Sequence, residues 1–169
     1  MSSSPANHFL TKLHLSELAL QATTLNYIQD GSGAKMAFAP SAGIPELKEY
    51  PEITAAVEEI ANYRNQKPLH LMINVLMPGV VVPIHRDWLT PTSYQGNNPT
   101  VERWHLPVMT NTEAIFWDEE AGARHLVEGV WYGPIKYWIQ HQIWNHGTKP
   151  RIHIVVDLDT PERQGEYAP

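Results

Sequence analysis

The stretch HLMINVLMPGVVVPIHRD, from His70 to Asp87, decides what kind of fold this chain forms. It contains two short runs rich in Val, Ile, Leu and Met, and Pro78 and Gly79 separate them. Short apolar runs with β-branched residues, bounded by turn residues, are typical of strands. The stretch therefore predicts two strands joined by a turn, with a polar His-Arg-Asp tripeptide at the end of the second.

Runs of the same kind continue along the chain as far as residue 158. They lie at 103–110, 114–117, 129–132 and 152–158, with Gly, Pro and Asn between them. Many short strands separated by turns are typical of a β-sandwich or barrel. The pattern predicts an α+β, mainly β fold, in which N-terminal helices pack on a jelly-roll core.

Two helices are expected before these strands, because apolar residues recur there at three- and four-residue steps. The first covers 16–28, with Ser16 as its N-cap. The second opens at Pro51, a residue favoured in the first turn of a helix, and ends at Pro68.

The remaining segments predict loops and a single domain. Residues 30–45 are rich in Gly, Ser and Pro, which predicts a loop, and 88–101 predict a polar loop long enough to be functional. We expect residues 1–8 to be a flexible N-terminus. Residues 9–169 fit one domain, with its β-core at about 69–160.

Composition excludes several classes of protein. The chain has 169 residues and a net charge of −6, with nine His and no Cys. The acidic balance argues against a nucleic-acid partner, and no apolar run is long enough for a membrane span. No secretory leader is visible, so we expect a cytoplasmic protein. Without Cys, a metal must be bound by imidazole and carboxylate groups.

The tripeptide His85-Arg86-Asp87 offers such groups. Residues i and i+2 of a strand point the same way, so His85 and Asp87 can converge on one ion. One imidazole and one carboxylate are two of the three ligands in the facial triad that binds non-haem Fe(II). Composition does not choose the third ligand, for which the candidates are His105, His125, His141, His146 and His153.

Three stretches give the chain a resemblance to a known family. They are Asn74–Asp87 (NVLMPGVVVPIHRD), Arg103–Val108 (RWHLPV) and His141–Asp157 (HQIWNHGTKPRIHIVVD). In the third, an Arg stands ten residues after the first His and begins an apolar strand. In order and spacing they resemble the non-haem Fe(II)/2-oxoglutarate oxygenases, specifically the aspartyl/asparaginyl β-hydroxylase branch, which includes small bacterial amino-acid hydroxylases.

The resemblance implies a double-stranded β-helix with a catalytic iron site. His85, Asp87 and His141 are the implied metal ligands and catalytic residues. Arg151 is expected to pair with the distal carboxylate of 2-oxoglutarate, and a guanidinium suits this role because it is a permanently charged, two-pronged donor. The implied cofactors are Fe(II), 2-oxoglutarate as co-substrate, and O₂.

Four more residues are candidates for the site. Asn74 and His105 match family positions that contact the co-substrate. Arg103 matches a position associated with an acidic group of the substrate. Trp88 directly follows the metal tripeptide, which makes it a candidate for substrate binding.

The implied reaction is hydroxylation of an unactivated C–H bond, with release of succinate and CO₂. Arg103, and after it Arg86 and Arg124, could bind a carboxylate. The expected substrate is therefore a small carboxylate-bearing molecule such as a free amino acid, or else an amino-acid side chain in a peptide. Neither nucleic acid nor a membrane is expected as a partner.

Two other functions fit parts of the sequence. A cupin-type metal enzyme could use His and carboxylate ligands without 2-oxoglutarate, but it has no need of Arg151. A non-catalytic jelly-roll module for ligand binding would carry its His residues incidentally. Arg151 is therefore the residue that separates the oxygenase from these alternatives.

Other polar and aromatic residues are expected to be structural. His125, His146 and His153 are interpreted as structural or solvated, although His153 shares a strand face with Arg151. The acidic triplet Asp118–Glu120 is interpreted as a solvated turn, and most of the six Trp residues as packing.

Overall fold

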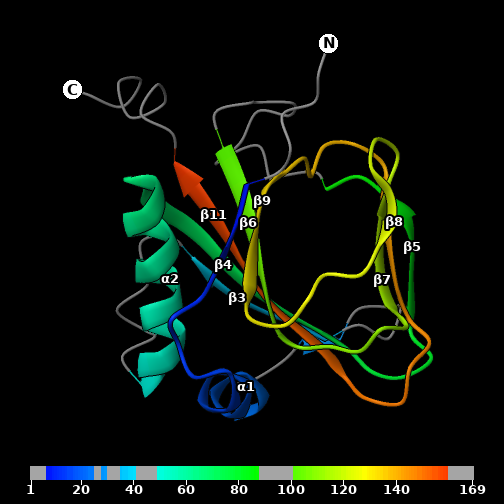
Figure 1. The fold of residues 1–169 in the computed structure, drawn as a ribbon, viewed down its shortest axis with the longest axis horizontal. Helices are drawn as coiled ribbons and strands as arrows, with labels where there is room; N and C mark the ends of the chain where they lie inside the picture. Colours follow the sequence, from blue (N-terminus) through cyan, green and yellow to red (C-terminus); the bar gives the residue numbers. More distant parts are fainter. Residues whose placement is uncertain (1–6, 25–27, 30–34, 41–48, 88–100, 160–169) are drawn as a thin grey trace.

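The computed structural model of the chain describes residues 7–24, 28–29, 35–40, 49–87 and 101–159. Within these ranges the chain forms two antiparallel sheets and two helices, arranged in layers (Figure 1). The helices lie against one face of the larger sheet, and the smaller sheet lies on its other side. This is the mainly β jelly roll, with added helices, that the sequence predicts.

The larger sheet has seven strands and the smaller sheet has four. In spatial order the larger sheet contains β1 (Asn7–Leu10), β9 (Val130–Ile135), β6 (Val101–Met109), β11 (Arg151–Asp159), β4 (Lys67–Leu76), β3 (Lys35–Pro40) and β2 (Ile28–Gln29). The smaller contains β5 (Val81–His85), β10 (His141–Asn145), β7 (Ala114–Asp118) and β8 (Gly122–Arg124). Strand β11 therefore lies at the centre of the larger sheet, between β6 and β4.

One face of the larger sheet is apolar and packs against the helices. Alternate residues of β4, β6 and β11 form a single core with residues of both helices: Leu71, Ile73, Val75, Trp104, Leu106, Val108, Ile152, Ile154, Val156 and Leu158, with Leu18, Ile53, Val57 and Ile60. Burial of this apolar area drives the packing of the helices onto the sheet. The residues between them point to the opposite face, toward the smaller sheet.

Helix α2 (Pro51–Arg64) begins at the predicted proline but ends earlier than predicted. Asn65 adopts the left-handed conformation, with φ 52° and ψ 45°, and the backbone N–H of Gln66 donates to the carbonyl of Ala61. This cap ends the helix. The predicted end at Pro68 is wrong, because Pro68 already lies in β4.

Helix α1 covers Leu15–Thr24, so it is shorter than the predicted 16–28. Ser16 lies inside the helix and is not its N-cap, because the helix begins one residue earlier. Ile28 continues the helical spacing in the sequence, but it lies in β2 and pairs with Met36 of β3. Pairing within the sheet has overridden the local helical pattern.

The prediction of a loop over 30–45 is wrong at 35–40, where the chain forms β3. This strand pairs with β4, from Lys35 opposite Val75 to Pro40 opposite His70. This pairing satisfies backbone groups of β4 that would otherwise be left at an open edge. The loop prediction followed the flanking Gly, Ser and Pro residues and missed the short strand between them.

The predicted strands are all present with shifted ends, and β10, which had not been predicted, lies beside β5. The expected flexible segment was 1–8, whereas Asn7 and His8 already pair with β9. The polar loop predicted at 88–101 lies outside the described residues, except for Val101, which begins β6. Across the described ranges, no helix is long and apolar enough to cross a membrane.

Candidate active site

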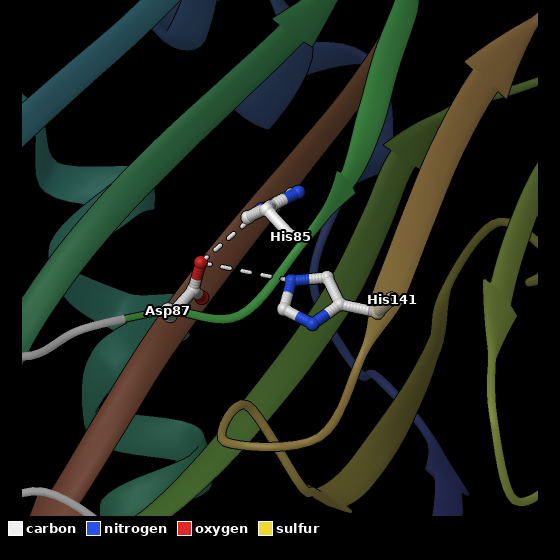
Figure 2. A group of neighbouring side chains, drawn as sticks. All are labelled: His85, Asp87 and His141. Carbon is white, nitrogen blue, oxygen red and sulfur yellow. Dashed lines mark ion pairs between the residues drawn. The ribbon is translucent and has the colours of Figure 1, made fainter.

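Three side chains that could bind a metal ion meet where β5 and β10 pair. His85 lies opposite His141 in this pairing, and Asp87 follows two residues after the end of β5. Their candidate ligand atoms all lie within 4.8 Å of one another. Asp87 Oδ1 is 3.3 Å from His85 Nε2 and 3.6 Å from His141 Nε2 (Figure 2). In the part of the chain that the structure describes, this is the only such group of three.

Both imidazoles are held with one nitrogen toward Asp87. The Nδ1 of His85 lies 2.8 Å from the carbonyl oxygen of Pro83, and the Nδ1 of His141 lies 3.0 Å from that of Ile139. A carbonyl can only accept, so each Nδ1 donates to it and each Nε2 is the nitrogen turned toward Asp87. Nε2 is therefore the nitrogen of each ring that could bind a metal, with Nδ1–H held by the backbone.

Asp87 is ionised. Burial alone would raise the pKa of its carboxyl group, but the nearby imidazoles of His141 and His85 and the Arg103 guanidinium outweigh burial. The pKa of Asp87 therefore lies well below its ordinary value. Two imidazoles and one carboxylate are the donor set of a facial Fe(II) site.

Arg151 is a buried cation that pairs with no carboxylate of the described residues. It begins β11 and is 1% exposed. Its Nη2 donates to His153 Nδ1 at 2.9 Å, and its Nη1 has no partner in the part of the chain that the structure describes. Burial lowers the pKa of Arg151 to about 9. Burying a charge without a counter-ion is costly, so the site is suited to an anionic ligand.

Other unpartnered polar atoms surround Arg151. Asn74 Oδ1, His153 Nε2 and both ring nitrogens of His105 are buried, and no other described residue hydrogen-bonds to them. Asn74 lies opposite His153 across β4 and β11, and the His105 and His153 rings are 5.9 Å apart. Buried polar atoms are nearly always satisfied in native proteins, so this cluster fits a polar ligand.

His153 is the member of this cluster that had been interpreted as structural or solvated. Arg151 can only donate, so His153 Nδ1 accepts and its Nε2 carries the proton. Burial, reinforced by the charge of Arg151, holds the pKa of His153 well below its ordinary value, so the ring is neutral. The signal in the sequence was its position two residues after Arg151, which gives both side chains the same strand face.

Phe116 connects the cluster to the metal ligands. Its ring centroid is 5.8 Å from that of His105 and 5.8 Å from that of His141. It belongs to an apolar group between the sheets, formed with Leu76, Leu126, Ile135 and Ile143. These apolar side chains lower the local dielectric between the sheets, and a low dielectric strengthens electrostatic interactions.

Arg103 is bonded to carboxylates of the chain itself. Its Nε and Nη2 donate to the two oxygens of Asp157 at 2.7 and 2.8 Å, and its Nη1 donates to Asp87 Oδ2. The guanidinium also lies 4.8 Å from the centre of the Tyr137 ring. The predicted contact between Arg103 and a substrate acid stays a prediction, and Asp157 is a partner that the sequence did not identify.

The remaining candidates make other contacts or lie outside the described residues. Trp88 lies outside the described residues. His125 Nδ1 lies 3.2 Å from the carbonyl oxygen of Ala114, which is a structural contact. Trp104 and Trp131 are fully buried in the core, as expected of packing residues.

The acidic triplet is only partly the solvated turn that the sequence predicts. Asp118 is 5% exposed. It accepts the backbone N–H of Ala121 at 2.6 Å and pairs with Arg124 Nη2 at 2.6 Å. Burial would raise the pKa of Asp118, but these donors outweigh it and the pKa is lowered. Asp118 is therefore a structural carboxylate that orders the turn between β7 and β8.

Comparison with known proteins agrees with this geometry. A jelly roll with a His-Asp-His group at the end of a strand pair is an arrangement that non-haem Fe(II) oxygenases use. The sequence matches the family described as Aspartyl/Asparaginyl beta-hydroxylase over residues 42–161, which is more than half of its length. The chain belongs to the aspartyl/asparaginyl β-hydroxylase family. Among curated proteins, no sequence matches it.

Solved structures share the fold at low sequence identity. A prolyl-4-hydroxylase from Pseudomonas putida superposes with a TM-score of 0.64 at 8% identity, covering 93% of this chain and 94% of that one. The viral collagen prolyl hydroxylase of Paramecium bursaria Chlorella virus-1, in a 2-oxoglutarate complex, gives 0.61 at 9% identity, covering 94% and 97%. A 2-oxoglutarate–Fe(II) oxygenase family oxidoreductase from Burkholderia pseudomallei gives 0.51 at 10% identity, covering 86% and 77%.

Family membership confirms that the chain is an enzyme of the oxygenase and hydroxylase type. The predicted cofactors, Fe(II) with 2-oxoglutarate and O₂, are consistent with the His85, Asp87 and His141 group. Membership favours the oxygenase over the cupin-type enzyme and the non-catalytic binding module.

Proposed function

We propose that this chain is an Fe(II)- and 2-oxoglutarate-dependent hydroxylase. In this proposal His85, Asp87 and His141 bind the iron, and Arg151 binds the distal carboxylate of 2-oxoglutarate. The observation that carries it is the buried Arg151 guanidinium, which among the described residues has an unpartnered Nη1 and no carboxylate partner. A dicarboxylate supplies the missing negative charge.

The other unpartnered atoms support the same ligand. His153 offers an Nε2–H donor next to Arg151, and Asn74 and His105 add polar groups on the same face of the sheet. A carboxylate accepts several hydrogen bonds, so binding it satisfies the donors of this set, Arg151 Nη1 and an N–H of His153 and of His105, whereas Asn74 Oδ1 is itself an acceptor. We propose His153 as a co-substrate contact in addition to Asn74, His105 and Arg151.

The chain's own residues prepare the site before any reaction. When bound, ferrous iron with 2-oxoglutarate supplies the activation of O₂ for attack on a C–H bond. The Nδ1–H of each ligand imidazole is fixed by a backbone carbonyl, and Asp87 is charged. Three protein ligands leave coordination positions open, and Arg151 orients the co-substrate from the far end.

The proposed substrate is a free amino acid or another small carboxylic acid, with an amino-acid side chain in a peptide as the second choice. Arg124 supports this class. Its guanidinium lies 5.1 Å from the Phe116 ring centre. Its Nη2 pairs with Asp118, and its Nη1 is buried with no partner among the described residues. Phe116 in turn contacts the His141 ligand, so Arg124 could bind a substrate anion close to the metal.

The names of two similar structures guide the first assays. Two of the similar structures are prolyl hydroxylases, so free L-proline belongs among the first substrates tested.

We also propose that residues 9–169 act as one domain. A cytoplasmic location fits this proposal because ferrous iron and 2-oxoglutarate are both present there.

The test compares the wild-type protein with Arg151→Ala in two measurements. The rate of succinate formation gives the KM for 2-oxoglutarate, and a separate binding titration gives the Kd for Mn²⁺. A lost charge-assisted hydrogen bond is worth about 1.5–3 kcal/mol, so the KM for 2-oxoglutarate should rise by at least about tenfold. The Kd for Mn²⁺ should stay within about twofold, because Arg151 does not touch the metal ligands.

Lys136→Ala is the control, since Lys136 is an exposed cation paired with Glu120 on the surface. It should change neither quantity. Equal loss of metal and co-substrate binding in Arg151→Ala would mean that Arg151 is structural. A wild-type protein that binds metal but never 2-oxoglutarate would favour the cupin-type alternative.

A further inference from the structure

Asp87 presents its two carboxylate oxygens to different partners. Oδ1 faces the two ligand imidazoles, 3.3 Å from His85 Nε2 and 3.6 Å from His141 Nε2. Oδ2 accepts a hydrogen bond from Arg103 Nη1. One oxygen is therefore directed into the ligand group, and the other is held outside it.

Arg103 is itself fixed in place by Asp157. The two residues are opposite each other in the β6–β11 pairing, and the guanidinium donates hydrogen bonds to both oxygens of Asp157 through Nε and Nη2. Arg103 is 4% exposed and Asp157 is 1% exposed. Because a guanidinium is planar and rigid, binding Asp157 along one edge determines where Nη1 points.

This arrangement explains an otherwise costly feature of the core. Asp157 is a charged residue within β11, all nine residues of which are buried. A carboxylate in such a place needs a paired cation, and Arg103 provides it. The guanidinium in turn has an Nη1 left over, and that donor is used on Asp87.

We propose that Arg103, held by Asp157, is a positioning residue that keeps Asp87 a one-oxygen ligand of the metal. The inference rests on the proposed function, in which His85, Asp87 and His141 bind Fe(II). A free carboxylate can bind an ion through one oxygen or through both. Holding Oδ2 prevents the second mode, and so it keeps one more coordination position open for the co-substrate and O₂.

The test uses Arg103→Lys and Asp157→Asn in the full chain. Lysine keeps the charge but cannot bind both carboxylates with one planar fork, and asparagine keeps the shape of the Asp157 side chain but weakens its grip on Arg103. Each variant is loaded with Co²⁺, whose visible spectrum reports coordination number. The Kd for Co²⁺ and the Kd for 2-oxoglutarate on the Co²⁺-loaded protein are then measured.

In both variants we expect the Co²⁺ spectrum to shift toward a higher coordination number and the Kd for 2-oxoglutarate to rise about 10- to 100-fold. The Kd for Co²⁺ should be retained or improved, because Asp87 then supplies a second oxygen. Mere destabilisation does not produce this combination, since it would weaken both ligands together.

Glu102→Gln is the matched control. Glu102 is the neighbour of Arg103 in β6, but it pairs with Arg64 of α2 on the helix side of the sheet. This variant should leave the spectrum and both Kd values unchanged. Wild-type spectra and affinities in Arg103→Lys and Asp157→Asn would overturn the positioning role.

A structure of the metal-loaded wild type tests the proposal if the variants fail to fold. It should show Asp87 bound through Oδ1 alone with Arg103 on Oδ2, and binding through both oxygens would overturn the proposal. A wild type that binds neither Co²⁺ nor 2-oxoglutarate contradicts the proposed function itself. A wild type that binds both, with unaltered variants, contradicts only the role of Arg103.

Discussion

Asn145 shows how a single buried amide can join three segments of this fold. It is 0% exposed. Its Nδ2 donates to the carbonyls of Leu76 at 3.0 Å and Lys149 at 2.8 Å. Its Oδ1 accepts from Asn111 Nδ2 at 3.1 Å and from the backbone N–H of Gly147 at 3.2 Å. The side chain thereby ties the end of β10, the strand that carries His141, to the end of β4.

Replacing this amide should be among the more damaging single changes in the chain. In Asn145→Ala, buried backbone groups lose their partners, so the free energy of unfolding should fall by about 3 kcal/mol. Urea denaturation measures this difference. Asn111→Ala is the comparison: it removes one of the four bonds together with two exposed bonds of Asn111, to the Lys149 carbonyl and from the Glu113 backbone N–H, and should cost about 1 kcal/mol. A loss in Asn145→Ala no larger than that in Asn111→Ala would mean that the buried bonds of Asn145 contribute little.

At the scale of elements, β6 connects two different environments through consecutive residues. Arg103 faces the metal ligands, whereas Glu102 faces α2 and accepts from Arg64 Nε and Nη2, both at 2.8 Å. Burial would raise the pKa of Glu102, but the paired guanidinium outweighs it and the pKa is lowered. The ion pair thus fixes α2 to the strand that also supports the site.

This pairing makes part of the stability dependent on pH. A carboxyl group whose pKa is lowered on folding stabilises the protein above its unfolded value, about 4.5, and loses that contribution as pH falls through the folded value. Glu102→Gln should therefore reduce the free energy of unfolding by about 1 kcal/mol at pH 7. The gap from wild type should shrink toward pH 3. Urea titrations at both pH values test this, and a gap independent of pH would exclude the ion pair as its cause.

For the molecule as a whole, the larger sheet separates a dry core from a polar interior. Its helix side carries Leu, Ile, Val and Trp, whereas its other side carries the unpartnered groups that surround Arg151. Unsatisfied polar groups and a ligand cluster of His and Asp reduce the stability of the empty protein. Ligands that satisfy them should therefore stabilise the whole fold.

Ligand binding should be visible as a rise in melting temperature. At a Mn²⁺ concentration of 100 times its Kd the gain is about 2.7 kcal/mol, which corresponds to a rise in Tm of about 5–10 °C for a domain of this size. Adding 2-oxoglutarate should raise Tm further. Differential scanning calorimetry should show the Mn²⁺ shift in His146→Ala, an unrelated histidine, but not in His141→Ala. A shift that persists in His141→Ala would place the metal elsewhere.

Features that depend on neighbouring residues could be predicted from the sequence, whereas features that depend on pairing between distant segments could not. His85 and Asp87 were found from i and i+2 spacing on a strand, and the helix start at Pro51 from its residue type. His141 needed a family resemblance, because no local pattern separates it from four other histidines. The strand β3 was missed because its pairing with β4 overrides flanking turn residues.

The pairing of Arg103 with Asp157 could not be predicted from sequence for a different reason. The residues are 54 positions apart and meet only because β6 and β11 adopt one particular register. A shift of a single residue would turn every side chain of β11 to the other face, placing Arg151, His153 and Asp157 in the apolar core. Register follows from the packing of the whole sheet, so a short stretch of sequence does not reveal it.

The central position of β11 also has a consequence for how the protein is made. β11 is the last of the described strands to leave the ribosome, yet it fills the gap between β6 and β4. During synthesis these two strands must wait with unpaired edges, which is the condition under which sheet proteins aggregate or recruit chaperones. Arg151 and Asp157 arrive on this same strand. A nascent chain therefore gains the ability to bind its co-substrate only in the step that completes its sheet.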